Sequence, residues 1–128
     1  MKTELRFAAH PDDVKHYDTE RLRKEFLIEN LFEKNELILI YSMYDRYIAG
    51  GAMPADKPVK LESFTELQSE NFLDRREMGI INIGGTAEVL TQSGSFIIGY
   101  KEALYFGKGT TGVEFISADP DHPAKLYI

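Results

Sequence analysis

The sequence predicts an all-β domain of antiparallel strands, with one short helix near the N-terminus. All ten glycines lie between Gly50 and Gly112, which indicates that turns are concentrated in this part of the chain. Short β-branched and aromatic segments recur there about every 8–12 residues, a spacing typical of sandwiches and barrels. No long helical pattern alternates with these segments, which disfavours a parallel βαβ sheet.

The first expected element is a short helix within an N-terminal arm of residues 1–35. Asp18 or Thr19 suits the N-cap position, and an acidic residue follows in the first turn. Leu22 and Phe26, four residues apart, form one apolar side of about two to three helical turns. The C-terminal end of the helix stays open, because the stretch FLIENLF equally suits the start of an extended segment.

Residues 36–128 are expected to form the β domain. Residues 36–54 suit two strands in a hairpin or a crossover, interrupted near Ser42–Asp45 and closed by a glycine pair and a proline. The stretch 54–72 stays open between a loop and a helical turn. Six further short strands are expected in the segments FLDRREMGIINIGG, AEVLT, SFIIGY, EALYFGKG, VEFISAD and AKLYI.

Composition excludes several classes of protein. The chain has 128 residues, a net charge of −6 and no cysteine. The length is sufficient for one packed core. The negative net charge is unsuited to non-specific nucleic-acid binding. The lack of cysteine excludes disulfides and thiolate zinc sites. The N-terminus has no apolar signal segment and no apolar run approaches the ~20 residues of a membrane span, so we expect a cytoplasmic protein. The final segment stops in an apolar alternation at Ile128, from which we expect a longer parent protein.

Two spacings in the second half of the chain resemble the two signatures of the cupin family. Glu77, six residues and Gly84 match the end of the first signature. The stretch GYKEALYFGKGT, from Gly99 to Thr110, has the spacing of the second. The resemblance implies a small jelly roll, with residues 36–128 as a degenerate cupin-like β-barrel of antiparallel strands.

The metal ligands of those signatures are missing. The three histidine positions fall on residues of other types, namely Glu70 and Phe72 or Asn71 and Leu73, together with Thr110. A divalent transition metal needs three or four converging imidazole or carboxylate groups, which Phe and Leu cannot supply. The histidines that are present suit surface loops near the two ends of the chain, at His10, His16 and His122. We therefore expect no metal and no other cofactor in this chain.

Four longer strings carry a more specific resemblance: DTERLRKEFL, DRYIAGGAMP, DRREMGIINIGG and EALYFGKG. Together they resemble the N-terminal half of the 5-keto-4-deoxyuronate isomerases, also called 4-deoxy-L-threo-5-hexosulose-uronate ketol-isomerases, from about His16 to Ile128. The resemblance implies a hexameric two-cupin parent more than twice this length, whose zinc lies in a second, C-terminal cupin absent from this chain. It also implies conversion of 5-keto-4-deoxyuronate to 2,5-diketo-3-deoxygluconate in the breakdown of pectin and related polyuronides.

The substrate carboxylate implied by this family favours a cationic partner, and Arg76 and Lys108 are the candidates. Glu77 is expected to pair with an arginine rather than to act in catalysis. We assign no catalytic residue to this chain and expect it to be inactive alone, with the second cupin as its partner. Two alternatives stay open: a stand-alone module that binds sugar acids, and a structural oligomerisation domain.

Overall fold

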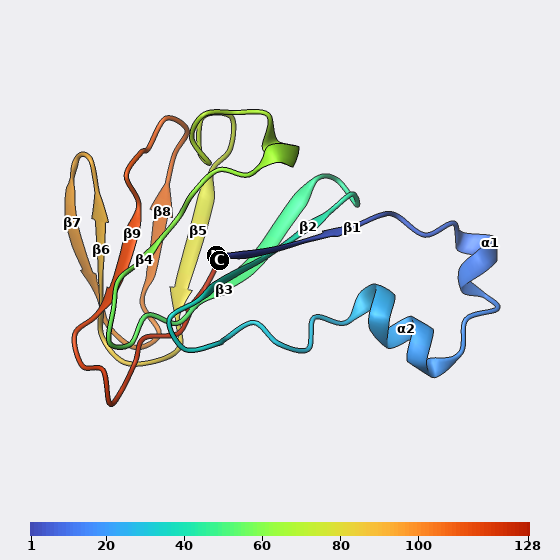
Figure 1. The fold of residues 1–128 in the computed structure, drawn as a ribbon, viewed down its shortest axis with the longest axis horizontal. Helices are drawn as coiled ribbons and strands as arrows, with labels where there is room; N and C mark the ends of the chain where they lie inside the picture. The colour runs from blue at the N-terminus through green and yellow to red at the C-terminus, as the bar shows by residue number, and fades with distance from the viewer.

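The fold is a pair of β-sheets that enclose one core, shown as a ribbon in Figure 1. The computed structural model describes residues 1–128. The larger sheet has the order β1-β2-β3-β10-β5-β8, with β1 (Lys2–Arg6), β2 (Leu37–Ser42), β3 (Tyr47–Ala52), β10 (Leu126–Tyr127), β5 (Met78–Asn82) and β8 (Ala103–Phe106). The smaller sheet has the order β4-β9-β6-β7, with β4 (Val59–Lys60), β9 (Glu114–Ser117), β6 (Ala87–Thr91) and β7 (Gly94–Ile98).

The core lies between the two sheets and follows from the two-residue period of their strands. In β5, Met78 and Ile80 are buried whereas Gly79 and Ile81 are exposed. Phe115 of β9, in the other sheet, is fully buried in the same hydrophobic cluster. The alternation places one face of each strand against the opposite sheet. The predicted all-β class and the six short strands of the second half are confirmed.

Residues 36–54 form a hairpin, which decides between the two connections left open by the sequence. β2 and β3 are antiparallel neighbours from the Leu37↔Ala52 pair to the Ser42↔Tyr47 pair. Asp45 and Arg46 in the turn both have φ of 55°. Two successive residues with positive φ are typical of the tight turns whose twist matches that of a hairpin.

The N-terminal arm contains two short helices, α1 (Pro11–Val14) and α2 (Thr19–Phe26). A single turn of 3-10 helix, η1 (Thr65–Leu67), lies later in the chain. The predicted N-cap of α2 is confirmed, because the Asp18 carboxylate accepts a 2.8 Å hydrogen bond from the Arg21 backbone N–H. No residue of either helix is buried, and both helices extend away from the sheets in Figure 1. No helix is long and apolar enough to cross a membrane.

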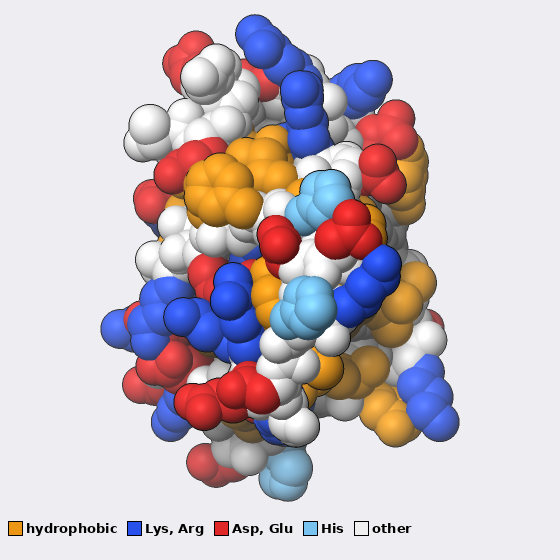
Figure 2. All heavy atoms as spheres, turned by 90° about the vertical axis from the view of Figure 1, so that its right-hand side faces the viewer, with side chains coloured by type: hydrophobic (Ala, Val, Ile, Leu, Met, Phe, Trp, Pro, Cys, Tyr) orange, Lys and Arg blue, Asp and Glu red, His pale blue; other side chains and the backbone are white.

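Figure 2 shows this end of the molecule with acidic and basic side chains interspersed around exposed hydrophobic groups. The exposed apolar side chains of the arm include Phe7, Leu22 and Phe26. Phe26 contacts Tyr44 of the β2–β3 turn, with ring centroids 6.3 Å apart. This aromatic contact and β1 attach the arm to the larger sheet.

β1 is an element that the sequence did not predict. It pairs in parallel with β2, from Lys2↔Ile38 to Arg6↔Ser42. The segment KTELR has only one large apolar residue, and its first three residues are exposed at the edge of the sheet. Charged residues are common on edge strands because they discourage further pairing, so a hydrophobic pattern does not reveal such a strand.

The two sheets do not close into the expected barrel. The larger sheet ends at β1 and β8, the smaller sheet ends at β4 and β7, and no ladder joins one sheet to the other. β4, at one edge of the smaller sheet, is only two residues long and provides little backbone for a ladder to the larger sheet. The stretch 54–72 holds β4 and one turn of 3-10 helix, which agrees with the helical turn left open there.

Candidate functional site

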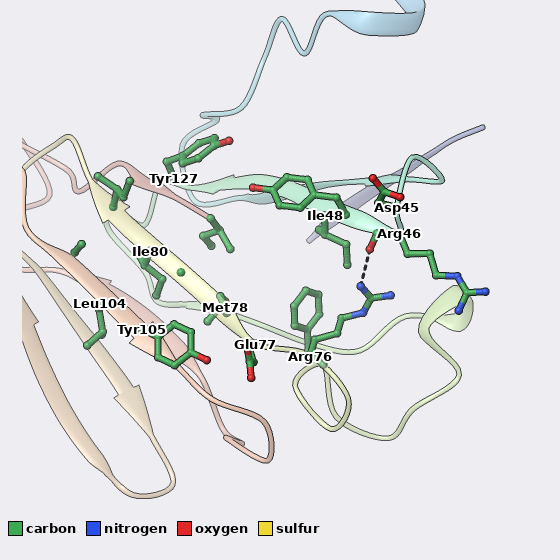
Figure 3. A pocket seen from close by; sticks show the side chains of 16 residues that line it. Asp45, Arg46, Ile48, Arg76, Glu77, Met78, Ile80, Leu104, Tyr105 and Tyr127 are labelled. Atoms are coloured by element: carbon green, nitrogen blue, oxygen red, sulfur yellow. Dashed lines mark hydrogen bonds between the residues drawn. The ribbon is translucent and has the colours of Figure 1, made fainter. Parts of the chain in front are cut away.

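A cleft of about 700 Å³ opens in the larger sheet between the first half of β3 and the first half of β5. Its lining is mainly apolar and includes Ile48, Phe72, Met78, Ile80 and Leu104. The polar groups at its rim are Asp45, Arg46, Tyr47, Arg76, Glu77, Tyr105 and Tyr127. Figure 3 shows the cleft from close by. An apolar cleft with a few polar groups is the usual form of a binding site.

The cleft exists because β10 separates β3 and β5 over only part of their length. β10 pairs with Ala52 and Gly51 of β3 on one side and with Asn82 and Ile81 of β5 on the other. Ile128 extends this contact by exchanging two backbone hydrogen bonds with Gly50, at 2.7 and 2.9 Å. Past this point no strand lies between β3 and β5.

Arg76 enters the cleft from the loop before β5, and its side chain is hydrogen-bonded to the β2–β3 hairpin. Its guanidinium donates to the Arg46 carbonyl at 2.8 Å, drawn dashed in Figure 3, and to the Tyr41 hydroxyl at 3.0 Å. The guanidinium carbon also lies 4.9 Å from the centroid of the Tyr41 ring. A planar cation with several donors suits this combination of stacking and hydrogen bonding. The arginine therefore fastens the loop before β5 to a turn whose backbone has positive φ.

Lys108 lies elsewhere, in the exposed turn between Gly107 and Gly109. The backbone N–H of Gly109 donates to the Leu73 carbonyl at 2.9 Å, which holds this turn against the loop before β5. Lys108 does not line the cleft and makes no ion pair. The structure therefore does not bring the two candidate cations, Arg76 and Lys108, together around one cavity.

The expected pairing of Glu77 with an arginine is wrong. Glu77 is exposed at the start of β5 and forms no ion pair, because water solvates its carboxylate without an arginine partner. Its neighbour is Tyr105 of β8, and the two side chains lie together in Figure 3. A hydrogen bond to the Glu77 carboxylate raises the pKa of the Tyr105 hydroxyl above its ordinary value.

The cupin ligand positions hold groups that do not fit a metal ion. Whichever of the two expected pairs is taken, Glu70 with Phe72 or Asn71 with Leu73, its second member is buried in the hydrophobic core. The Thr110 hydroxyl donates to the Gly107 carbonyl at 2.9 Å. His10 caps α1, and His122 lies 2.9 Å from Asp119 in an exposed turn. No group of three or more His, Asp or Glu side chains converges anywhere in the structure. A zinc ion, as implied by the family, would find no adequate set of donors here.

Asn82 is a structural residue of this region that the sequence analysis missed. It is fully buried at the end of β5, and its side-chain amide donates to the carbonyls of Gly85, Ile98 and Gly99 at 2.8–3.2 Å. Its side-chain oxygen accepts from the Gly84 backbone N–H at 3.0 Å. The signal for this role was a polar residue at a core-facing position of an apolar strand, in the string MGIIN.

Known proteins similar to this chain are named 4-deoxy-L-threo-5-hexosulose-uronate ketol-isomerase. One from Bacteroides fragilis is 51% identical over 129 residues, covering 99% of this chain and 46% of the relative. One from Bacteroides thetaiotaomicron is 50% identical with the same coverage. One from Lachnoclostridium phytofermentans is 50% identical over 125 residues, covering 98% of this chain and 45% of the relative.

No family model matches the chain. The chain spans about half the length of the curated relatives it matches. The resemblance indicated by the sequence motifs is confirmed: over nearly its whole length, the chain is similar to about the N-terminal half of the 4-deoxy-L-threo-5-hexosulose-uronate ketol-isomerases.

Proposed function

We propose that this chain is the N-terminal half of a 4-deoxy-L-threo-5-hexosulose-uronate ketol-isomerase and that it supports the reaction as a scaffold. The proposal rests on the similarity to relatives of that name, which are 50–51% identical to this chain over 99% of its length. The chain keeps the strands and turns of its signature-like segments, whereas the expected ligand positions hold Thr110 and either Glu70 with Phe72 or Asn71 with Leu73.

The chemistry of the reaction supports this division of roles. A ketol isomerisation moves a proton between neighbouring carbons, and it needs a base together with a group that stabilises the negative charge of the enediolate. The cleft offers the exposed carboxylate of Glu77, but Arg76 is already bonded to Arg46 and Tyr41. Zinc has no fitting donors in this chain, so no step of the reaction is assigned to a metal here. We assign the reacting groups to the other half of the longer protein.

The proposed partners are that other half, a second cupin by family resemblance, and further copies in a hexamer. The support from this chain is the exposed arm, whose helices bury none of their own side chains. Arg76 and Lys108 remain proposed contacts for the substrate carboxylate. Arg76 keeps N–H groups that its two hydrogen bonds do not use, and Lys108 has no partner within the chain.

An isomerase assay tests the proposal. The full-length protein, which includes the half beyond this chain, is incubated with 5-keto-4-deoxyuronate and the product is followed by NMR. We expect conversion by the full-length protein and none by the 128-residue chain. Absence of conversion by the full-length protein, or conversion by the 128-residue chain alone, would contradict the proposal.

The same assay tests the two candidate cations in the full-length protein. If either side chain contacts the substrate carboxylate, Arg76→Ala or Lys108→Ala raises KM by about tenfold or more, because one charge-assisted hydrogen bond is lost. The matched controls are Arg75→Ala and Lys101→Ala, which remove exposed cations that do not line the cleft. A KM equal to that of the control variant removes the tested residue from the substrate site.

A further inference from the structure

The gap between β3 and β5 has the shape and the bonding pattern of an unfilled strand position. β10 is antiparallel to both of its neighbours, with Tyr127 opposite Gly51 of β3 and Ile81 of β5. At this end β10 alone separates β3 and β5, at the usual spacing of about 4.8 Å to each neighbour.

The backbone groups that face this gap have no partner strand. In an antiparallel ladder, successive residues direct their N–H and C=O groups to opposite sides. Gly50 bonds to Ile128, so Ile48, two residues earlier in β3, points its N–H and C=O into the gap. Asn82 bonds to the β8 side, so Gly79, three residues earlier in β5, points its N–H and C=O into the gap from the opposite side.

The side chains around the gap suit an apolar strand. Ile48 and Met78 face the core side, where Met78 is buried and Ile48 packs against the hydrophobic cluster. On the outer side, a Cβ built at Gly79 would meet no heavy atom within 4 Å. Figure 3 shows Ile48 and Met78 on opposite sides of this space. One face of an inserted strand would therefore be buried and the other accessible.

We infer that the longer protein fills this gap with an extended segment that continues β10, so that β3 and β5 are bridged along their whole length. The inference rests on the proposed function, which supplies a longer chain, and it identifies where the rest of that chain contacts this half. The occupant is a strand of the same polypeptide, because the relatives of this chain are about twice its length. The pairing of Ile128 with Gly50 gives the register of the open position.

The register of β10 against β3 and β5 defines each contact of the inserted strand. Its first residue lies opposite Ala49 and Gly79 and exchanges backbone hydrogen bonds with Gly79. Its second residue lies opposite Ile48 and Met78, exchanges backbone hydrogen bonds with Ile48, and turns its side chain to the core. This second residue is therefore apolar. The strand occupies the apolar part of the cleft, so a sugar acid does not bind there in the longer protein.

Hydrogen exchange of individual backbone amides, followed by NMR, tests the inference in the full-length protein. We expect the Ile48 and Gly79 amides to exchange as slowly as the Gly50 amide, which is bonded in the structure described here. In the 128-residue chain, the same two amides are expected to exchange at least about 100-fold faster than in the full-length protein. The Leu39 and Ile80 amides, inside paired strands, serve as controls in both proteins.

Three outcomes would contradict the inference, and a fourth concerns the proposed function alone. Fast exchange of Ile48 and Gly79 in the full-length protein shows that the gap stays open. Protection that appears in the 128-residue chain only as its concentration rises identifies a second copy as the occupant, and protection that requires added galacturonate identifies a sugar acid. A full-length protein with slow exchange at both amides but no isomerase activity refutes the proposed function alone.

Discussion

Asn82 shows how one buried polar residue organises several backbone segments. Its side chain satisfies three carbonyls and one N–H, which belong to the turn after β5 and to the end of β7. A buried backbone group without a hydrogen-bond partner costs about 1–3 kcal/mol. The apolar strand that contains Asn82 is predictable from its sequence, but the partners of Asn82 are not, since they come from segments far along the chain.

Replacing Asn82 tests this role. Asn82→Ala removes the side-chain partner of four buried or partly buried backbone groups, and we expect the free energy of unfolding to fall by about 2–4 kcal/mol. Urea denaturation followed by circular dichroism measures the change. Asn30→Ala is the matched control, because Asn30 is exposed, and its expected effect is within about 0.5 kcal/mol. Equal effects of the two substitutions would show that the buried network does not stabilise the fold.

In the candidate site, the types of the residues do not determine their contacts or their exposure. Arg76 was selected from the sequence as a cation near a signature-like motif, and it does line the cleft. Its contacts with Arg46 and Tyr41 arise from a hairpin about 30 residues earlier, which no local pattern reveals. Glu77 was expected to pair with an arginine, which a buried carboxylate would need, and its exposure removes that need.

At the scale of elements, the strands and turns of the second half were predictable because each has a local cause. β-branched and aromatic runs define the strands, and glycines define where the chain turns or where two segments approach closely. Gly85 is one such close approach: a Cβ built there would lie 1.9 Å from the His122 carbonyl oxygen. The Gly85 N–H also donates to the Pro123 carbonyl at 3.1 Å, so the turn after β5 packs directly on the segment before β10.

A single added methyl group at this contact tests its importance. Gly85→Ala forces the backbone of residues 122–123 away from the turn, and we expect the free energy of unfolding to fall by more than about 2 kcal/mol. Gly107→Ala is the control, because a Cβ there meets no atom within 4 Å. Thermal unfolding of the two variants compares them directly. A Gly85→Ala variant as stable as Gly107→Ala would mean that the two segments are not in contact.

The N-terminal arm contains the element that local patterns did not reveal. The start of α2 was predictable from its capping residue, Asp18, since an N-cap acts on the next few residues only. β1 was not predictable, because its pairing partner β2 lies more than 30 residues away and its own residues are largely charged. Long-range pairing of a polar edge strand is determined by the rest of the sheet and leaves no periodic signal.

At the scale of the whole molecule, two layers of antiparallel strands were predictable from strand spacing, whereas their lack of closure was not. Closure would need ladders between the edge strands of the two sheets, and β4, at one edge of the smaller sheet, has only two residues. Such long-range pairing leaves no local pattern in the sequence.

The central proposal is that this chain is the metal-free half of a longer zinc enzyme, because the expected ligand positions hold Thr110 and one buried core residue, Phe72 or Leu73. Zinc analysis by inductively coupled plasma mass spectrometry tests the claim most directly, on the full-length protein and the 128-residue chain purified under the same conditions with added zinc. The account predicts stoichiometric zinc in the full-length protein and only background zinc in the 128-residue chain. Stoichiometric zinc in the 128-residue chain would contradict it.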